Sequence, residues 1–110
     1  MREIKFRAFD SIDKEFINID NITLKELQKA QKKFGTKLMQ LTGLKDKNGV
    51  DIYEGDICYN ENTSKKGFIR FDYGWAIQYS ENYSHDMPQY YCDRIEVIGN
   101  IYEHPNLLEL

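Results

Sequence analysis

The chain opens with charged and apolar residues in alternation. In residues 3–9, the apolar side chains of Phe6 and Ala8 fall on one face of an extended segment, and charged Arg7 falls on the other. A period of two is typical of a half-buried strand. The turn-forming sequence DSIDK follows, and the alternation returns in EFINI. Residues 3–19 are therefore predicted to form a β-hairpin.

The period then changes to that of a helix. Apolar residues recur at helical spacing in NITLKELQKAQKKFG, Thr23 and Glu26 have the spacing of a capping box, and Gly35 provides a left-handed stop. An amphipathic helix over about residues 24–34 is therefore predicted. Its outer face carries Lys25, Lys29, Lys32 and Lys33. We interpret these lysines as a solvated face, with a weak anion or nucleic-acid contact as the alternative.

After the helix, the pattern is again that of short strands. KLMQLTGL, DIYEGDICY and DRIEVIGNIYEHP are predicted strands, and KGFIRFDYGWAIQYS is a predicted hairpin around an Asp-Tyr-Gly turn. Residues 60–66 and 81–89 are polar and are expected to be loops. Pro105 can open a last helical turn in PNLLEL, whose leucines need a surface to pack on.

These elements indicate a mainly β fold with one α-helix. Gly55 and Gly99 lie within strand-like segments, where glycine fits the sharp bends of a small barrel. We therefore expect a single domain over residues 1–110. Its architecture would be a small barrel or a strongly bent antiparallel sheet, with an N-terminal β-hairpin and one amphipathic helix.

Composition and charge exclude several classes of protein. Residues 1–49 hold 11 Lys and Arg against 7 Asp and Glu, whereas residues 50–110 hold 4 against 11, and the net charge is −3. The basic half is too weakly charged to predict a nucleic-acid binder by itself. The start lacks the apolar core of a signal peptide, and no apolar run approaches the roughly 20 residues of a membrane span. We therefore expect a cytoplasmic protein with no membrane partner.

Candidate chemistry is sparse. The acidic stretch LTGLKDKNGVDIYEGDI fits no frame of a calcium-binding loop, and Asn48-Gly49 instead predicts a two-residue type I′ turn. His85 beside Asp86 and His104 near the C-terminus accompany no nucleophile motif, and both are interpreted as surface histidines. We predict no catalytic, cofactor-binding or metal-binding residue, and we expect a protein that is not an enzyme.

The cysteines and aromatic residues are given structural roles. Cys58 and Cys92 form no CxxC pair and are expected to be buried thiols. The aromatic-rich segment contains Phe68, Phe71, Tyr73, Trp75, Tyr79, Tyr83, Tyr90 and Tyr91. Few Lys and Arg are interleaved with these rings, so base stacking is disfavoured and most of them are expected in the core. Two or three are expected in a protein interface, and Tyr83, Tyr90 and Leu108 are the first candidates.

Three segments of the sequence resemble the YopX family of phage and prophage proteins. They are REIKFRAFD at the start, LMQLTGLKDKNGVDIYEGDI in the middle and IEVIGNIYEHPNLLEL at the end. The resemblance implies a mostly β fold with an SH3-like barrel element. It also implies an origin in a phage or integrated prophage of a Gram-positive bacterium, and thus a location in the bacterial host cell. It carries over no catalytic residue.

The sequence leads to a main functional hypothesis and an alternative. The main one is a non-enzymatic phage accessory protein that acts through protein contacts, as a homo-oligomer or with a phage or host protein. It rests on the aromatic richness and the leucine-rich tail. The alternative is a small nucleic-acid-binding β-barrel that uses the basic helix.

Overall fold

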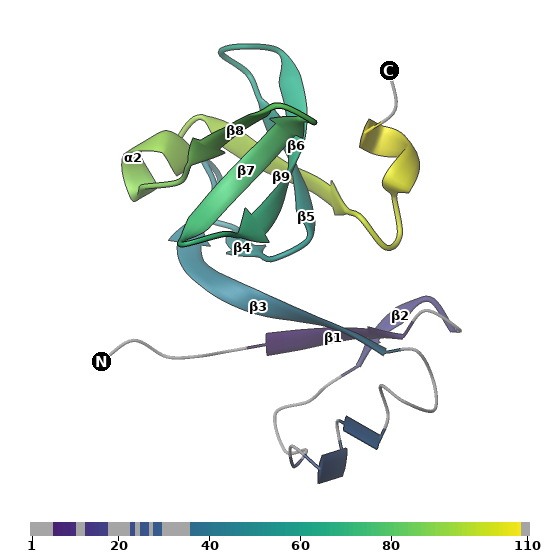
Figure 1. The fold of residues 1–110 in the computed structure, drawn as a ribbon. Helices are drawn as coiled ribbons and strands as arrows, with labels where there is room; N and C mark the ends of the chain where they lie inside the picture. Colours follow the sequence, from purple (N-terminus) through teal and green to yellow (C-terminus); the bar gives the residue numbers. More distant parts are fainter. Residues whose placement is uncertain are drawn as a thin grey trace.

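The computed structural model describes residues 6–10, 13–17, 23, 25–26, 28–29 and 36–108. Figure 1 shows the fold. Along the chain, the strands are β1 (Phe6–Asp10), β2 (Glu15–Ile17), β3 (Thr36–Lys45), β4 (Asp51–Tyr53), β5 (Asp56–Asn60), β6 (Lys65–Phe71), β7 (Trp75–Ser80), β8 (Tyr83–Asp86) and β9 (Ile95–Asn100). A short helix, α2 (Gln89–Cys92), precedes β9, and a 3₁₀ turn, η1 (Pro105–Leu108), follows it.

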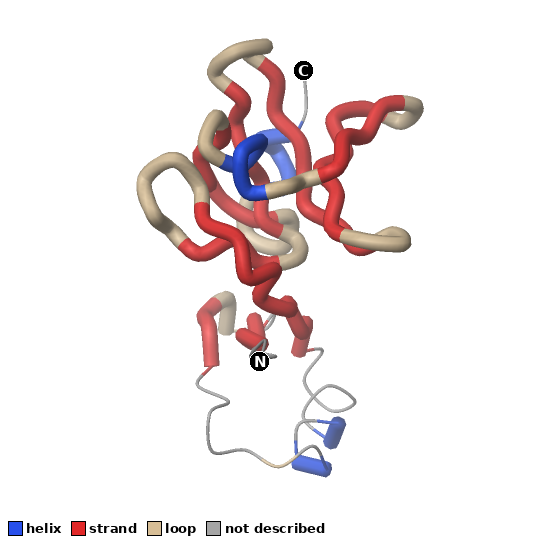
Figure 2. The backbone as a smooth tube through the Cα atoms, turned by 90° about the vertical axis from the view of Figure 1, so that its left-hand side faces the viewer, coloured by secondary structure: helices blue, strands red, loops and turns tan. Residues whose placement is uncertain are grey.

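The strands form two antiparallel sheets, so the predicted mainly β fold is confirmed. One sheet has the order β2-β1-β3-β4, and the other has the order β8-β7-β6-β5-β9 and curls into a half barrel. Within the first sheet, the long strand β3 pairs with β1 through residues 36–40 and with β4 through Leu41 and Lys45. In both Figure 1 and Figure 2, the β1–β2 hairpin lies to one side of the curled sheet, with β3 running between them.

The predicted N-terminal hairpin is present, but its faces differ from the prediction. β1 pairs with β2 in a register that sets Phe9 opposite Phe16. Ala8 and Phe9 are both buried, so β1 is covered on both faces. Arg7, which alternation alone placed toward solvent, instead reaches the start of β5 and pairs with Asp56.

The predicted helix over residues 24–34 lies mostly outside the described residues. The four described there, Lys25, Glu26, Gln28 and Lys29, are helical. The capping-box contact is present in part, because the Glu26 N–H donates to Thr23 Oγ1 at 3.1 Å. Among the described helices, none is long and apolar enough to cross a membrane.

Two elements lie where loops were expected. Residues 81–89 contain β8 and the start of α2, and β6 begins at Lys65, within the other predicted loop. The sequence of β8, YSHD, shows no apolar alternation, because β8 is an edge strand that pairs only with β7 and has mostly exposed side chains. The final helical turn predicted at Pro105 is confirmed as η1.

The main core lies against the inward face of the curled sheet. Its buried members are Ile52, Cys58, Ile69, Ile77, Met87, Tyr91, Cys92 and Ile95. Ile69 and Ile77 lie opposite each other on β6 and β7 and fill the centre of the sheet. Cys58 and Cys92 are both free and buried, as the sequence predicted.

Candidate interaction surface

The acidic loop between β3 and β4 is built around one buried carboxylate. Asp46 Oδ1 accepts the N–H groups of Asn48 and Val50, each at 2.9 Å. Its Oδ2 accepts the N–H of Val97 on β9, also at 2.9 Å. The Asp46 side chain therefore closes the loop and fastens it to the far edge of the curled sheet, and its oxygens are engaged by main-chain donors.

A turn at Asn48-Gly49 is confirmed, but the predicted type I′ is wrong. Gly49 has φ +79°, whereas Asn48 does not have a positive φ. The Asp46 N–H donates to the Val50 carbonyl at 2.9 Å, and the Gly49 N–H donates to the Asp46 carbonyl at 3.0 Å. These bonds enclose a three-residue loop, a type I turn followed by a left-handed glycine. The longer loop needs the left-handed conformation only at glycine.

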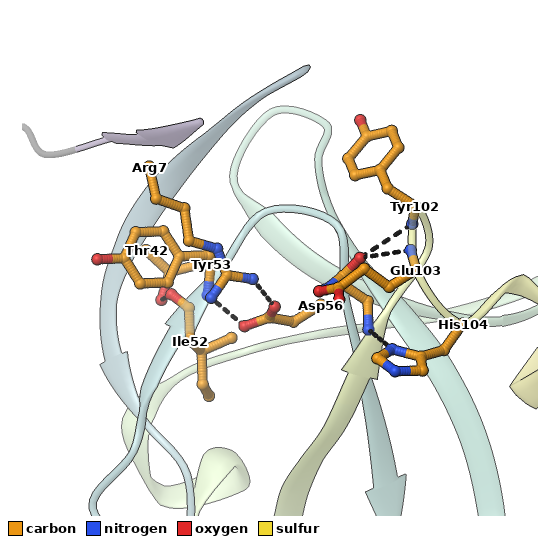
Figure 3. A network of polar contacts seen from close by, with 9 residues as sticks. Arg7, Thr42, Ile52, Tyr53, Asp56, Tyr102, Glu103 and His104 are labelled. Carbon is orange, nitrogen blue, oxygen red and sulfur yellow. Dashed lines mark hydrogen bonds and ion pairs between the residues drawn. The ribbon is translucent and has the colours of Figure 1, made fainter. Parts of the chain in front are cut away.

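A second buried carboxylate joins the two sheets (Figure 3). Asp56 accepts the Tyr53 N–H at 2.8 Å and forms an ion pair with Arg7. The Arg7 Cζ atom lies 4.3 Å from the ring centroid of Tyr53 and 4.6 Å from that of Phe16. Burial raises the pKa of the Asp56 carboxyl, although Arg7 and the Tyr53 N–H act in the opposite direction. This pair is a structural link between β1 and the turn before β5.

The two histidines take part in separate local contacts. His85 Nδ1 lies 2.6 Å from the main-chain oxygen of Asp86, and its ring stacks on Tyr91 with centroids 4.0 Å apart. His104 Nδ1 accepts the Asn100 N–H at 3.3 Å (Figure 3). His85 Nδ1 therefore contacts a backbone oxygen, and not the carboxylate that would orient a general base.

The cysteines are poor nucleophiles where they lie. Burial raises the pKa of the Cys58 thiol well above its usual value and that of Cys92 to about 11. Since the thiolate is the reactive form, little of either is available at neutral pH. In the described ranges, no group of three or more His, Cys, Asp or Glu side chains gathers in an arrangement that could hold a metal ion.

The aromatic segment is much more exposed than the sequence suggested. Of its rings, Phe68, Trp75 and Tyr79 are half-buried, Phe71, Tyr73, Tyr83 and Tyr90 are exposed, and only Tyr91 is buried. The expectation that most of them are core is therefore wrong. Ile69 and Ile77 already fill the centre of β6 and β7. Trp75 and Tyr79 pack only partly against this core, and the exposed rings lie at strand ends, in the β6–β7 turn and on α2.

Three of these rings, Tyr73, Trp75 and Tyr90, border a groove with a volume of about 760 Å³, which we call the aromatic groove. It is lined by Leu44, residues 72–75, residues 85–88 and Tyr90. Tyr73, in the turn between β6 and β7, is fully exposed, and Tyr90 on α2 is 70% exposed. The least exposed lining residue is Met87, at 4%. The groove thus combines a buried apolar residue with two accessible rings.

The helix α2 that carries Tyr90 is fixed in place. The Gln89 side chain accepts the Lys45 N–H at 3.2 Å and donates to the Lys45 carbonyl at 2.9 Å. On the other side of Tyr90, Tyr91 is buried and its hydroxyl accepts a hydrogen bond from Asn60 at 3.1 Å. Both sequence neighbours of Tyr90 therefore anchor the helix and leave this ring in solvent.

The predicted interface residues divide between two surfaces. Tyr83 and Leu108 lie together in a second groove of about 540 Å³, the tail groove, lined by residues 64–66, Tyr79, Ser80, Tyr83, Leu107 and Leu108. The rings of Tyr79 and Tyr83 stack there with centroids 5.6 Å apart. Tyr90 belongs to the aromatic groove instead.

The four lysines of the alternative hypothesis are only partly described. Lys25 and Lys29 are exposed, and Lys32 and Lys33 lie outside the described residues.

The sequence did not single out Tyr73, Trp75 or Asp86 as surface residues. A signal for Tyr73 was present, because a ring in the middle of a tight Asp-Tyr-Gly turn has no flanking strand to pack on. No comparable signal marked Trp75 or Asp86. Their proximity depends on the β7–β8 pairing, which sets Ala76 opposite Asp86.

Comparisons with known proteins identify the family of the chain. The family model described as YopX protein matches residues 5–109. The crystal structure of protein EF1440 from Enterococcus faecalis is similar, with 27% sequence identity and a TM-score of 0.69, and the match covers 97% of this chain and 99% of that one. The sequence matches none of the curated proteins with which it was compared. Since the family match spans nearly the whole length, the chain belongs to the YopX family.

Proposed function

We propose that this protein is a non-enzymatic interaction module, a phage or prophage accessory protein that works as a homo-oligomer and contacts a phage or host protein. The observation that carries the proposal is a set of exposed rings, which are Phe71 on β6, Tyr73 in the turn after it, Tyr83 on β8 and Tyr90 on α2. Exposed tyrosines on a fixed scaffold are typical of protein-binding surfaces, because they add contact area at a small cost in side-chain entropy.

The backbone at Tyr73 supports a role for its ring. Tyr73 has φ +61° and is fully exposed. A bulky residue in the left-handed region is uncommon and costs free energy, and no intramolecular packing of this ring offsets that cost. The presence of tyrosine at this position supports a role for its ring in contact with a partner protein.

The tail groove is the surface we assign to self-association. Tyr83, Leu107 and Leu108 provide apolar area, and Lys65 Nζ lies 5.7 Å from the centroid of the Tyr83 ring. Light scattering tests the assignment: a mass of at least twice 13.1 kDa is expected. Tyr83→Glu with Leu108→Glu should return the mass to that of one chain, and Tyr90→Glu should not. A monomeric wild-type protein at all concentrations would overturn the proposed oligomer.

A partner is tested by affinity purification from phage-infected host cells. A protein that is retained after nuclease treatment, and lost with Tyr73→Glu, supports the interaction module. Capture that disappears with nuclease treatment would point to the alternative function.

That alternative is a nucleic-acid-binding barrel, and one observation favours it. Lys25 and Lys29 are exposed and stand four residues apart on helical backbone, so they share one face. Salt-dependent binding to DNA or RNA that weakens with Lys25→Glu and Lys29→Glu would support this function. The net charge of −3 acts against it.

A further inference from the structure

We propose that the aromatic groove binds an extended, proline-containing peptide segment that carries arginine or lysine. This inference rests on the proposed interaction function and names the chemistry of the partner. The groove is distinct from the tail groove, to which self-association is assigned.

The rings of the groove suit a polyproline-like ligand. Tyr73 lies in a turn and Tyr90 on a one-turn helix, and the lining of the groove also contains Trp75 and Pro88. Trp75 is also held by Phe71, whose ring meets it edge to face with centroids 5.0 Å apart. A polyproline II segment has no internal hydrogen bonds to satisfy and docks through ring and pyrrolidine faces.

The charge of the groove selects a cationic segment. Asp72 and Asp86 are its charged lining residues, and the lining contains no lysine or arginine. Asp86 is exposed, and its carboxylate forms no ion pair or hydrogen bond within the part of the chain that the structure describes. Asp72 pairs with Arg70 at 2.7 Å, but both side chains are accessible to water. Such exposed pairs are weak and exchange readily with a competing cation.

The tail groove offers the opposite charge. Its lining includes Lys65 and Lys66. A cationic peptide should therefore discriminate between two grooves that both contain tyrosine, and this difference supplies matched controls.

The aromatic groove is also preorganised. The Met87 N–H donates to the Trp75 carbonyl at 3.3 Å, and Gln89 fastens α2 to β3 through both main-chain groups of Lys45. A surface that is already fixed loses little conformational entropy when a ligand binds.

Peptide binding can be followed by the fluorescence of Trp75, because it is the only tryptophan of the chain. The probe is the peptide acetyl-PPRPPRPPRPP-amide, which has no aromatic residue and does not interfere with the fluorescence. The control is acetyl-PPEPPEPPEPP-amide. We expect a saturating change in Trp75 fluorescence with the arginine peptide and none with the glutamate peptide over the same concentrations.

Substitutions inside and outside the aromatic groove test whether the arginine peptide binds there. Tyr90→Ala and Asp86→Asn should each weaken binding of the arginine peptide by at least about fivefold. The matched controls, Tyr83→Ala and Glu81→Gln, should change it by less than about twofold, since both lie outside the aromatic groove. Thermal unfolding checks that each variant is folded.

Each other outcome overturns the inference. No saturation with the arginine peptide removes the ligand class, and equal binding of both peptides removes the role of the carboxylates. Equal losses for Tyr90→Ala and Tyr83→Ala remove the assignment to this groove. If the wild-type protein forms an oligomer and captures a partner but does not bind the arginine peptide, this inference is rejected and the proposed function stands.

Discussion

At the scale of single residues, Tyr73 provides an exposed ring, but its left-handed backbone lowers the stability of the fold. Tyr73→Gly should raise the free energy of unfolding by about 0.5–1 kcal/mol, because the left-handed cost for a side-chain-bearing residue exceeds the added entropy of a glycine in the unfolded chain. The exposed ring loses no packing in exchange. Urea unfolding measures the gain, and Trp75 fluorescence should show weaker binding of the arginine peptide.

Ser64 provides the control for this prediction. It also has a positive φ, +58°, and is exposed, but it lies in the tail groove. Ser64→Gly should give a similar gain in stability with unchanged peptide binding. A decrease in the stability of Tyr73→Gly would mean that the ring supports the fold.

Among the residues of the acidic loop, Asp46 should lower the free energy of unfolding most when it is replaced. Asp46→Ala leaves three main-chain N–H groups without their acceptor and should lower the free energy of unfolding by at least about 3 kcal/mol. Asp51→Asn, in an exposed pair with Lys45, should cost less than about 1 kcal/mol. Urea unfolding compares them, and similar losses would contradict the structural role of Asp46.

The sequence predicted the Asn48-Gly49 turn but not what holds it. Local residues supply the turn chemistry, whereas one partner of Asp46, the Val97 N–H, lies 51 positions along the chain. A contact of that kind exists only after the curled sheet has formed. Asp46 lies in an acidic stretch that fits no calcium-binding frame, and in the fold its carboxylate is a structural acceptor.

At the scale of elements, the Gln89 amide ties α2 to β3, in addition to the burial of Tyr91 and Cys92. Gln89→Glu keeps the shape but cannot donate to the Lys45 carbonyl, and its carboxylate faces that oxygen. We expect faster hydrogen exchange at the Lys45 amide and weaker binding of the arginine peptide, because Tyr90 loses its fixed position. Tyr90→Ala should weaken binding without changing that exchange. Unchanged exchange in Gln89→Glu would show that α2 is held by its buried residues alone.

Elements were predictable where a periodic apolar pattern or a turn signal is present in the local sequence. The alternation in β1 and β2 identified the first hairpin, and the Asp-Tyr-Gly turn identified the β6–β7 hairpin. β8 and α2 were missed because each is four residues long and neither shows a periodic apolar pattern. Together with residues 87–88 between them, these two missed elements provide half of the lining of the aromatic groove, so the site could not be assembled from the sequence.

At the scale of the whole molecule, closure of the half barrel follows from contacts between distant segments. The Lys47 N–H donates to the Ile95 carbonyl at 3.0 Å and brings the β3–β4 loop onto β9. Many short strands and glycines predicted a bent sheet. Which edges meet was not predictable, because main-chain pairing carries no residue-specific signal.

The link between the two sheets yields a pH-dependent prediction. The folded-state pKa of Asp56 lies above its usual value because burial outweighs the nearby Arg7. The contribution of this carboxyl to stability is therefore fully present below about pH 3.8 and is lost as the pH rises through the folded-state value. Arg7→Met removes the opposing cation and should raise that pKa further.

The stability of Arg7→Met should consequently fall below that of the wild type by an amount that grows between about pH 4 and about pH 7. Breaking such a pair on one side costs up to about 3–5 kcal/mol when it is buried, and less here because Arg7 is partly exposed. Adding Asp56→Asn should remove the pH dependence, since no charge is then left buried. Arg70→Met, in an exposed pair, is the control and should show a small difference that does not grow. Urea unfolding across this range decides the matter: a loss in Arg7→Met that is the same at every pH would mean that Arg7 holds the sheets together by packing between Phe16 and Tyr53, and that its charge is not required.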